Sequence, residues 1–279
     1  MSEIRLGQLS YINSLPIYHP LEDGLLAVKA QLVKQPPTTL NNLLYNDELD
    51  ASPVSSIEYA VHREKYYILP DLSISADGRV MSVMLFSKVP MDRLGGKRIC
   101  LTNASATGVA LTRILFDHYY RLKVDYQTCP PDLEKMLQQG DGAFLIGDNA
   151  MEACRYVTEK GLPYQVTDLG EVWKQFTGLK MVYALWVARR DFARENPAAV
   201  EYVSKTLLQA KEMGLARLSA VREEAHRRSG LPMDTLEEYY RILEYHLDQE
   251  AKKALLTFYD YAYQSGIIDQ RVQLEIWGE

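Results

Sequence analysis

Short apolar runs alternate with polar turns and helix-like segments along the first part of the chain. The first run, Ile4 to Leu9, is long enough for a buried strand and stops at the turn Tyr11-Ile12-Asn13-Ser14-Leu15-Pro16. Further strands are predicted at residues 31–34 and 49–54, with a helix from Thr38 between them. This β-α-β-α rhythm favours a mainly parallel sheet.

A second series of strands and helices follows. A strand is predicted at residues 80–85, a turn followed by a strand at 94–102, and a strand closing on a Gly-Asp turn at 142–148. The apolar run 181–188 predicts a strand that returns to the first part of the fold. Beyond Arg189 the pattern becomes helical, with stretches at residues 197–218, 220–228 and 234–264, and Gly266 as a helix stop. Ser55-Ser56-Ile57-Glu58 and Asp234-Thr235-Leu236-Glu237 both have the form of a capping box.

Two α/β series with a helical tail predict a two-lobed α/β fold with a central cleft and a helical C-terminal segment. Apolar crossings are predicted near residues 85–90 and 183–190. The first lobe then comprises residues 1–88 with 189–279, and the second comprises residues 89–188. A hinged pair of lobes predicts that a ligand binds in the cleft, but it does not identify a reaction.

Composition narrows the class of protein. The chain has 279 residues, of which 47% are hydrophobic and 24% charged, as in ordinary globular proteins. A net charge of −6 argues against a general nucleic-acid or anionic-membrane surface. No apolar run is long enough to predict a membrane span, and the first residues lack the apolar core of a secretory signal. The scattered Cys100, Cys129 and Cys154 fit free thiols, so a cytoplasmic location is expected.

Polar residues gather where predicted strands give way to helices. Helix starts present free backbone N–H groups, and hydroxyls there add donors that suit a carboxylate. The same residue types are the usual helix caps, so capping is the simpler explanation of each cluster taken alone. The clusters are Asn13-Ser14, Ser55-Ser56, Ser105-Ala106-Thr107 and Asp148-Asn149, and Ser82 adds a further hydroxyl within a strand.

Motifs for metals and nucleotide cofactors are missing from the sequence. It contains no HExxH, CxxC or DxDxDG pattern, no P-loop and no GxGxxG. His19 has no nucleophile at a recognisable spacing, and the capping box accounts for Glu58. The residues alone therefore indicate a two-lobed α/β protein that binds a small anion, without reaching a reaction.

Several motifs together resemble the chorismate dehydratase family of the futalosine route to menaquinone. They occur in the family's order and extend from about residue 4 to the end of the chain. They are Tyr11-Ile12-Asn13-Ser14-Leu15-Pro16, Val54-Ser55-Ser56-Ile57-Glu58-Tyr59, Ser82-Val83-Met84-Leu85-Phe86-Ser87, Leu145-Ile146-Gly147-Asp148 and Trp173-x3-Thr177-Gly178-Leu179.

The resemblance implies a type II periplasmic-binding-protein fold used as a cytoplasmic lyase. The family removes water from chorismate to give 3-[(1-carboxyvinyl)oxy]benzoate, with no metal or organic cofactor. By similarity, Asn13 and Ser82 are the expected catalytic residues. The expected substrate-binding residues are Ser14, Ser55, Ser56, Ser105, Thr107 and Asp148.

The chain departs from the family pattern in two places. Gly108 follows Thr107 where the family often has serine, and Lys180 follows Thr-Gly-Leu where the family tends to have proline. Two rival functions also stay open, a 1,4-dihydroxy-6-naphthoate synthase of the same pathway and a non-catalytic solute-binding protein. The opening Asn-Ser-x-Pro turn favours the dehydratase, and the missing export signal disfavours the receptor. Neither a nucleic-acid nor a membrane partner is expected, and a homodimer is left open.

Overall fold

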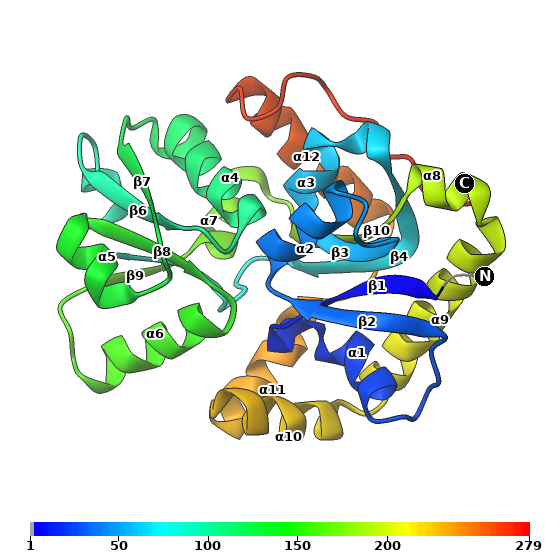
Figure 1. The fold of residues 1–279 in the computed structure, drawn as a ribbon. Helices are drawn as coiled ribbons and strands as arrows, with labels where there is room; N and C mark the ends of the chain where they lie inside the picture. The colour runs from blue at the N-terminus through cyan, green and yellow to red at the C-terminus, as the bar shows by residue number, and fades with distance from the viewer. Residues whose placement is uncertain (1–2) are drawn as a thin grey trace.

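Two β-sheets form the framework of the molecule in a computed structural model that describes residues 3–279 (Figure 1). The first sheet has the order β11-β4-β10-β3-β1-β2, with bounds Leu243–Glu244, Tyr66–Ala76, Met181–Arg189, Ala51–Ser55, Ile4–Leu9 and Ala30–Gln35. The second has the order β7-β6-β8-β5-β9, with bounds Asp125–Cys129, Arg98–Thr102, Gly142–Ile146, Val83–Ser87 and Gln165–Asp168.

Helices cover both sheets, as the predicted α/β class requires (Figure 1). Those that follow strands of the first sheet or form the C-terminal segment are α1 Leu15–Glu22, α2 Pro37–Tyr45, α3 Ser56–Val61, α8 Arg190–Glu195, α9 Pro197–Leu215, α10 Leu218–Ser229, α11 Met233–Ile242 and α12 Gln249–Gln264. Those around the second sheet are α4 Ala106–Ile114, α5 Leu133–Gln139, α6 Gly147–Glu159 and α7 Leu169–Thr177. The α/β class and the helical C-terminal segment are confirmed.

The predicted parallel pairing holds at the start of the chain. Strand β1 pairs in parallel with both β2 and β3, so the polar residues after these strands meet at one edge of the sheet. Strand β10 then runs antiparallel between β3 and β4, which makes the sheet mixed. The 11-residue strand β4 was absent from the predicted series, which passed from residue 60 directly to residue 80.

The strand pairing differs from the predicted lobe boundaries in two places. Strand β5, expected in the first lobe, pairs with β8 and β9 of the second sheet. Strand β10, placed almost wholly in the second lobe by the boundary at residue 188, pairs with β3 and β4 of the first. The chain instead crosses between the sheets at residues 77–82 and 178–180. The expected crossings near residues 85–90 and 183–190 overlap strands β5 and β10, and the chain passes between the sheets just before each of these strands.

The C-terminal helical segment is interrupted where one helix was predicted. Leu243 and Glu244 form a short strand with Ala76 and Ser75 of β4. A new helix then starts at Asp248, whose carboxylate accepts the Ala251 N–H at 2.7 Å. Neither predicted capping box forms, because Ser55 makes no capping bond and α11 begins one residue before Asp234. Gly266 follows α12 with φ +66°, as expected for a helix stop.

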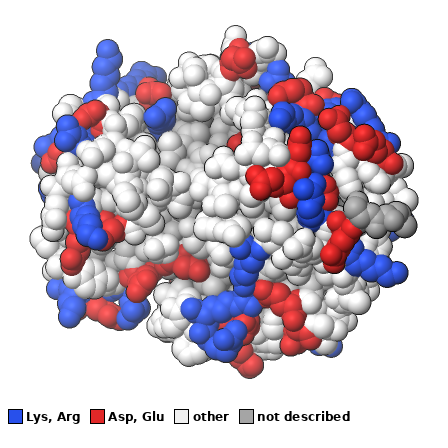
Figure 2. Space-filling view, viewed as in Figure 1, with Lys and Arg blue, Asp and Glu red and all other residues white. Residues whose placement is uncertain are grey.

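Charged side chains lie mainly over the periphery of the face drawn in Figure 2, and uncharged atoms cover its centre where the two lobes meet. The three cysteines are free thiols. No helix in residues 3–279 has both the length and the apolar character needed to cross a lipid bilayer.

Candidate active site

A pocket lies between the two lobes, and its empty space is about 610 Å³ when the open solvent at its mouth is included. Five of the eight predicted site residues line it, namely Asn13, Ser55, Ser82, Ser105 and Thr107. Most of the other lining residues are apolar, and they include Leu9, Val54, Ile74, Val83, Ile146 and Leu243. Within residues 3–279, no lysine, arginine, histidine, aspartate or glutamate lines this cavity. Its polar contacts are therefore hydroxyls, one amide and backbone groups.

Asn13 lies in the turn that follows β1, and its backbone is held from the far end of the chain. Tyr240 donates its hydroxyl to the Ile12 carbonyl at 2.7 Å, and Tyr245 donates to the Asn13 carbonyl at 2.8 Å. The side-chain oxygen of Asn13 is buried and has no hydrogen-bond partner in the described chain. A buried polar atom of this kind at a cavity wall is a candidate ligand contact.

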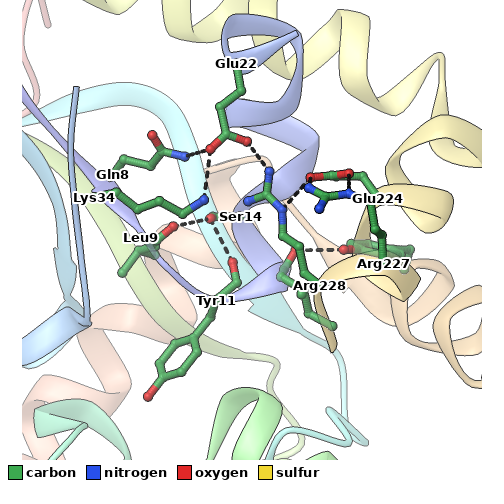
Figure 3. Close-up of polar contacts among 11 residues, drawn as sticks. Gln8, Leu9, Tyr11, Ser14, Glu22, Lys34, Glu224, Arg227 and Arg228 are labelled. Carbon is green, nitrogen blue, oxygen red and sulfur yellow. Dashed lines mark hydrogen bonds and ion pairs between the residues drawn. The ribbon is translucent and has the colours of Figure 1, made fainter. Parts of the chain in front are cut away.

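Ser14 does not line the cavity. Its hydroxyl is bonded to the Leu9 carbonyl at 3.2 Å and the Tyr11 carbonyl at 3.0 Å, so it shapes the turn that carries Asn13 (Figure 3). Behind this turn, Gln8, Lys34 and Arg228 converge on Glu22 at the end of α1 (Figure 3). Burial would raise the pKa of Glu22, but these hydrogen bonds hold it below its usual range.

Ser55 and Ser56 end β3 and begin α3, and their roles differ. Ser55 lines the cavity, and its N–H is held by the Asn41 side-chain oxygen at 3.2 Å. Ser56 does not line the cavity, because its hydroxyl is fully buried and donates to the Val182 carbonyl at 2.8 Å. Ser56 thus ties β3 to β10, while Ser55 is available to a ligand.

Helix α4 brings the second lobe to the cavity. Ser105 caps this helix by accepting the Gly108 N–H at 3.0 Å, and it also lines the cavity. The Thr107 hydroxyl accepts the Ile57 N–H at 3.2 Å and lies 3.2 Å from the Ser56 hydroxyl. Thr107 therefore joins the two lobes directly at the cavity wall.

Gly108 is required by the packing of this chain rather than by its backbone angle. A Cβ there would lie 2.4 Å from Phe144 Cζ and 3.1 Å from the Ser105 hydroxyl. Phe144 therefore occupies the space that the serine of related sequences would need.

Gly108→Ser is expected to destabilise the protein by about 1 to 3 kcal/mol through overpacking. Urea denaturation would measure the loss, and adding Phe144→Leu should restore part of it by opening space. A Gly108→Ser variant as stable as the wild type would contradict this packing argument.

Asp148 lies at the start of α6 and does not line the cavity. Its carboxylate accepts the Ile12 N–H at 3.3 Å, which links the second lobe to the turn beside Asn13. Burial raises the pKa of Asp148 to about 6, although the bond from Ile12 lowers it. The preceding Gly147 has φ +59°, and its N–H is held by the Ser82 carbonyl at 2.7 Å.

The raised pKa predicts a pH-dependent effect on stability. Because the folded-state pKa of Asp148 lies above its unfolded value, its contribution is full below about pH 4 and is lost as pH rises through about 6. Asp148→Asn should therefore stabilise the protein at pH 8 by up to roughly 2 to 3 kcal/mol, with the difference closing toward pH 4. Denaturation of both proteins across this pH range measures it.

Glu152→Gln on the same helix is the matched control, since Glu152 is exposed and its replacement should change little at any pH. An Asp148→Asn variant whose stability follows that of the wild type at every pH would show that the carboxylate is not strained by burial.

Ser82 is placed by a residue that the sequence interpretation missed. Asp168 ends β9, and one of its oxygens accepts the N–H groups of Val80 at 3.0 Å and Met81 at 2.7 Å. The other accepts the N–H groups of Gly170 and Glu171 in α7. Met81 has φ +64°, a strained angle for a residue other than glycine, and directly precedes Ser82. The Asp-x-x-Glu spacing of Asp168 and Glu171 is the signal that could have identified this cap.

Glu58 lies outside the cavity. Burial raises its pKa to about 7, while the neighbouring Tyr66 hydroxyl lowers it, and its carboxylate oxygen lies 3.7 Å from His62 Nε2. In the described residues 3–279, no group of three or more histidines, cysteines or acids is placed to hold a metal ion.

The chain matches the menaquinone biosynthesis family over residues 4–264. A chorismate dehydratase of Thermus thermophilus is 35% identical over 265 residues, covering 91% of this chain and 93% of that protein. A 1,4-dihydroxy-6-naphtoate synthase of the same organism is 28% identical over 68% of each chain. The periplasmic aliphatic sulphonate-binding protein of Escherichia coli aligns with a TM-score of 0.68 at 17% identity, over 99% of this chain and 98% of that one, and shows the fold alone. The chain therefore belongs to the menaquinone biosynthesis family and has a periplasmic-binding-protein-like fold.

Proposed function

We propose that this protein is a chorismate dehydratase, a carbon–oxygen lyase that converts chorismate into 3-[(1-carboxyvinyl)oxy]benzoate and water. The observation that carries the proposal is the convergence of Asn13 and Ser82 on one inter-lobe cavity with Ser55, Ser105 and Thr107. The identity to a curated chorismate dehydratase over 91% of the chain supports it.

The proposed reaction breaks the bond between a ring carbon and its hydroxyl oxygen and removes a proton from the neighbouring ring carbon. The proton and the hydroxyl leave together as water, and the ring becomes aromatic. Because aromatisation makes the reaction strongly downhill, the protein mainly has to orient the substrate and exclude competing rearrangements. Fixed donors and proximity can lower such a barrier by several kcal/mol.

The cavity supports a division of roles among neutral groups. The first turn of α4 directs the positive end of a helix toward the cavity, and Ser55 and Ser105 add hydroxyls that suit the substrate's carboxylates. The Thr107 hydroxyl, which is bonded to Ile57 and Ser56, holds the wall of the cavity in place. Asn13 then orients the leaving hydroxyl or a carboxylate through its unpaired amide oxygen or its amide nitrogen. Since no ionisable base lines the cavity within the described residues, we propose that a carboxylate of the substrate itself takes the ring proton.

Two alternatives predict different outcomes in one experiment. Purified protein is incubated with chorismate, conversion is followed by chromatography, and binding is followed by a thermal shift. Formation of the benzoate product supports the dehydratase. Binding without conversion supports a receptor, the function of the sulphonate-binding proteins that share the fold. If the protein neither binds nor converts chorismate, the next candidate is the larger substrate of the naphthoate synthase.

The remaining parts of the proposal come from the family resemblance. We propose a cytoplasmic enzyme that works without a metal or an organic cofactor. The absence of a cofactor is tested by assaying the protein after gel filtration in the presence of a strong chelator. An enzyme that needs no cofactor keeps its full rate under these conditions. A homodimer stays a prediction for the same gel-filtration experiment.

A further inference from the structure

Tyr183 is a cavity residue that neither the sequence motifs nor the family resemblance assigned. It lies in β10 and lines the cavity, and its hydroxyl oxygen is buried without a hydrogen-bond partner in the described chain. A buried hydroxyl left unpaired is unfavourable, so it is rarely retained without a partner that arrives later. Asn13 has the other unpaired buried oxygen at this cavity.

The backbone of β10 is irregular at Tyr183. Val182 is paired with Ser75 and Ala184 with Ile74, so Tyr183 is the extra residue of a β-bulge opposite β4. Bulges re-aim side chains and are common beside active sites. A regular strand would pair every residue here, so the bulge is a second, independent indication that the orientation of Tyr183 matters.

The Tyr183 hydroxyl packs against the first turn of α7. A Cβ added to Gly170 would lie 2.6 Å from the Tyr183 hydroxyl oxygen, and the Gly170 N–H is bonded to Asp168 at 2.9 Å. The same carboxylate accepts the N–H groups of Val80 and Met81, which precede Ser82. Burial and the charge of Asp168 raise the pKa of Tyr183 well above its usual value. Tyr183 and Ser82 therefore line one cavity and are both linked to Asp168.

The charge around Tyr183 selects the kind of oxygen that it can meet. The Asp168 carboxylate nearby would repel a carboxylate of the ligand, and its own oxygens already accept four backbone N–H groups. A neutral oxygen meets no such repulsion. The phenol also keeps its proton at any ordinary pH, so it acts as a donor.

We propose that Tyr183 donates a hydrogen bond to the ring hydroxyl of chorismate that leaves as water. This inference rests on the proposed function. As the carbon–oxygen bond breaks, negative charge grows on the departing oxygen, and the hydrogen bond from Tyr183 strengthens. The proton taken from the ring carbon passes to the departing oxygen to complete the water, so Tyr183 retains its own proton and no other reactant is needed.

Tyr183→Phe tests this role, because it removes only the hydroxyl. We expect kcat to fall by about 100-fold with KM changed little, since the bond strengthens in the transition state. We also expect the melting temperature to rise slightly, because an unpaired buried hydroxyl is removed. Tyr126→Phe is the matched control, since Tyr126 also has an unpaired buried hydroxyl but does not line the cavity. It should show the same small rise in melting temperature with unchanged kcat.

A chorismate analogue without the ring hydroxyl identifies the atom involved. Its inhibition constant should be the same for the wild type and Tyr183→Phe, because the proposed partner is absent. A weaker inhibition of Tyr183→Phe would show that Tyr183 holds another part of the ligand and would overturn the proposal, as would a Tyr183→Phe variant with wild-type kcat. If the wild type does not convert chorismate at all, the proposed function fails first, and this inference fails with it.

Discussion

Asn13→Asp is expected to reduce kcat/KM for chorismate by about 1,000-fold or more. The substitution keeps the shape of the side chain but puts a negative charge into a cavity that no cationic side chain lines within residues 3–279. The Asn13 oxygen is already buried and unpaired, so the new carboxylate has no partner there. A dianionic substrate would then meet a like charge, which costs several kcal/mol in a cavity shielded from water.

Asn42→Asp provides the matched control, because Asn42 is exposed on α2 and the same change of chemistry there should leave turnover intact. Steady-state kinetics of both variants gives the comparison, and their melting curves show whether each is folded. A folded Asn13→Asp variant with near wild-type activity would remove Asn13 from the catalytic account.

The second large effect is expected at Asp168. Each carboxylate oxygen of Asp168 accepts two backbone N–H groups in the wild type. In Asp168→Asn an amide nitrogen, which cannot accept a hydrogen bond, replaces one of these oxygens, so two N–H groups lose their partner. The expected loss is about 3 kcal/mol of unfolding free energy, since hydrogen bonds to charged groups are each worth about 1.5 to 3 kcal/mol. A fall in kcat should accompany it, because Met81 could then relax from φ +64° and shift Ser82.

Two measurements separate these effects. Urea denaturation gives the stability loss, and kcat measured well below the melting temperature gives the effect on Ser82. Asp132→Asn is the control, because Asp132 also caps a helix by accepting the Lys135 N–H at 3.1 Å, but its side chain is 39% exposed and does not line the cavity. If Asp168→Asn loses stability yet retains kcat, Asp168 does not position Ser82.

The sequence was sufficient to predict the edge of the first sheet. The apolar run Ile4–Leu9 forms β1, which Asn13 follows, and Ser55 ends β3, which pairs with β1 in parallel. Ser105 and Thr107 then reach the same cavity from α4. Local rules for strand ends and helix starts therefore identified Asn13, Ser55, Ser105 and Thr107, which line the cavity, while their roles toward a substrate stay a prediction.

The same rules could not separate a lining hydroxyl from a structural one. Ser14 and Ser56 neighbour lining residues, but their hydroxyls face backbone carbonyls, which only the folded chain reveals. Asp148 was expected to touch the substrate and instead accepts a backbone N–H from a residue 136 positions away. Side-chain direction at a junction depends on such distant partners, so sequence proximity to a site residue is weak support for a binding role.

The contacts that fix Asn13 were invisible for a related reason. Tyr240 and Tyr245 are more than 225 positions from the carbonyls that they bind, and both lie in a region predicted as one uninterrupted helix. The break at β11 arises because Leu243 and Glu244 complete the edge of the first sheet beside β4. Tertiary pairing overrode a helical pattern there.

Proton NMR of the reaction shows directly whether this cavity of neutral donors dehydrates chorismate. Chelator-treated protein is added to chorismate and the spectrum is followed with time. The ring signals of chorismate are expected to give way to those of a 1,3-disubstituted benzene, while the vinyl protons of the carboxyvinyl ether persist. Unchanged chorismate would contradict the proposed dehydration, and so would a rearranged product that has lost the carboxyvinyl ether.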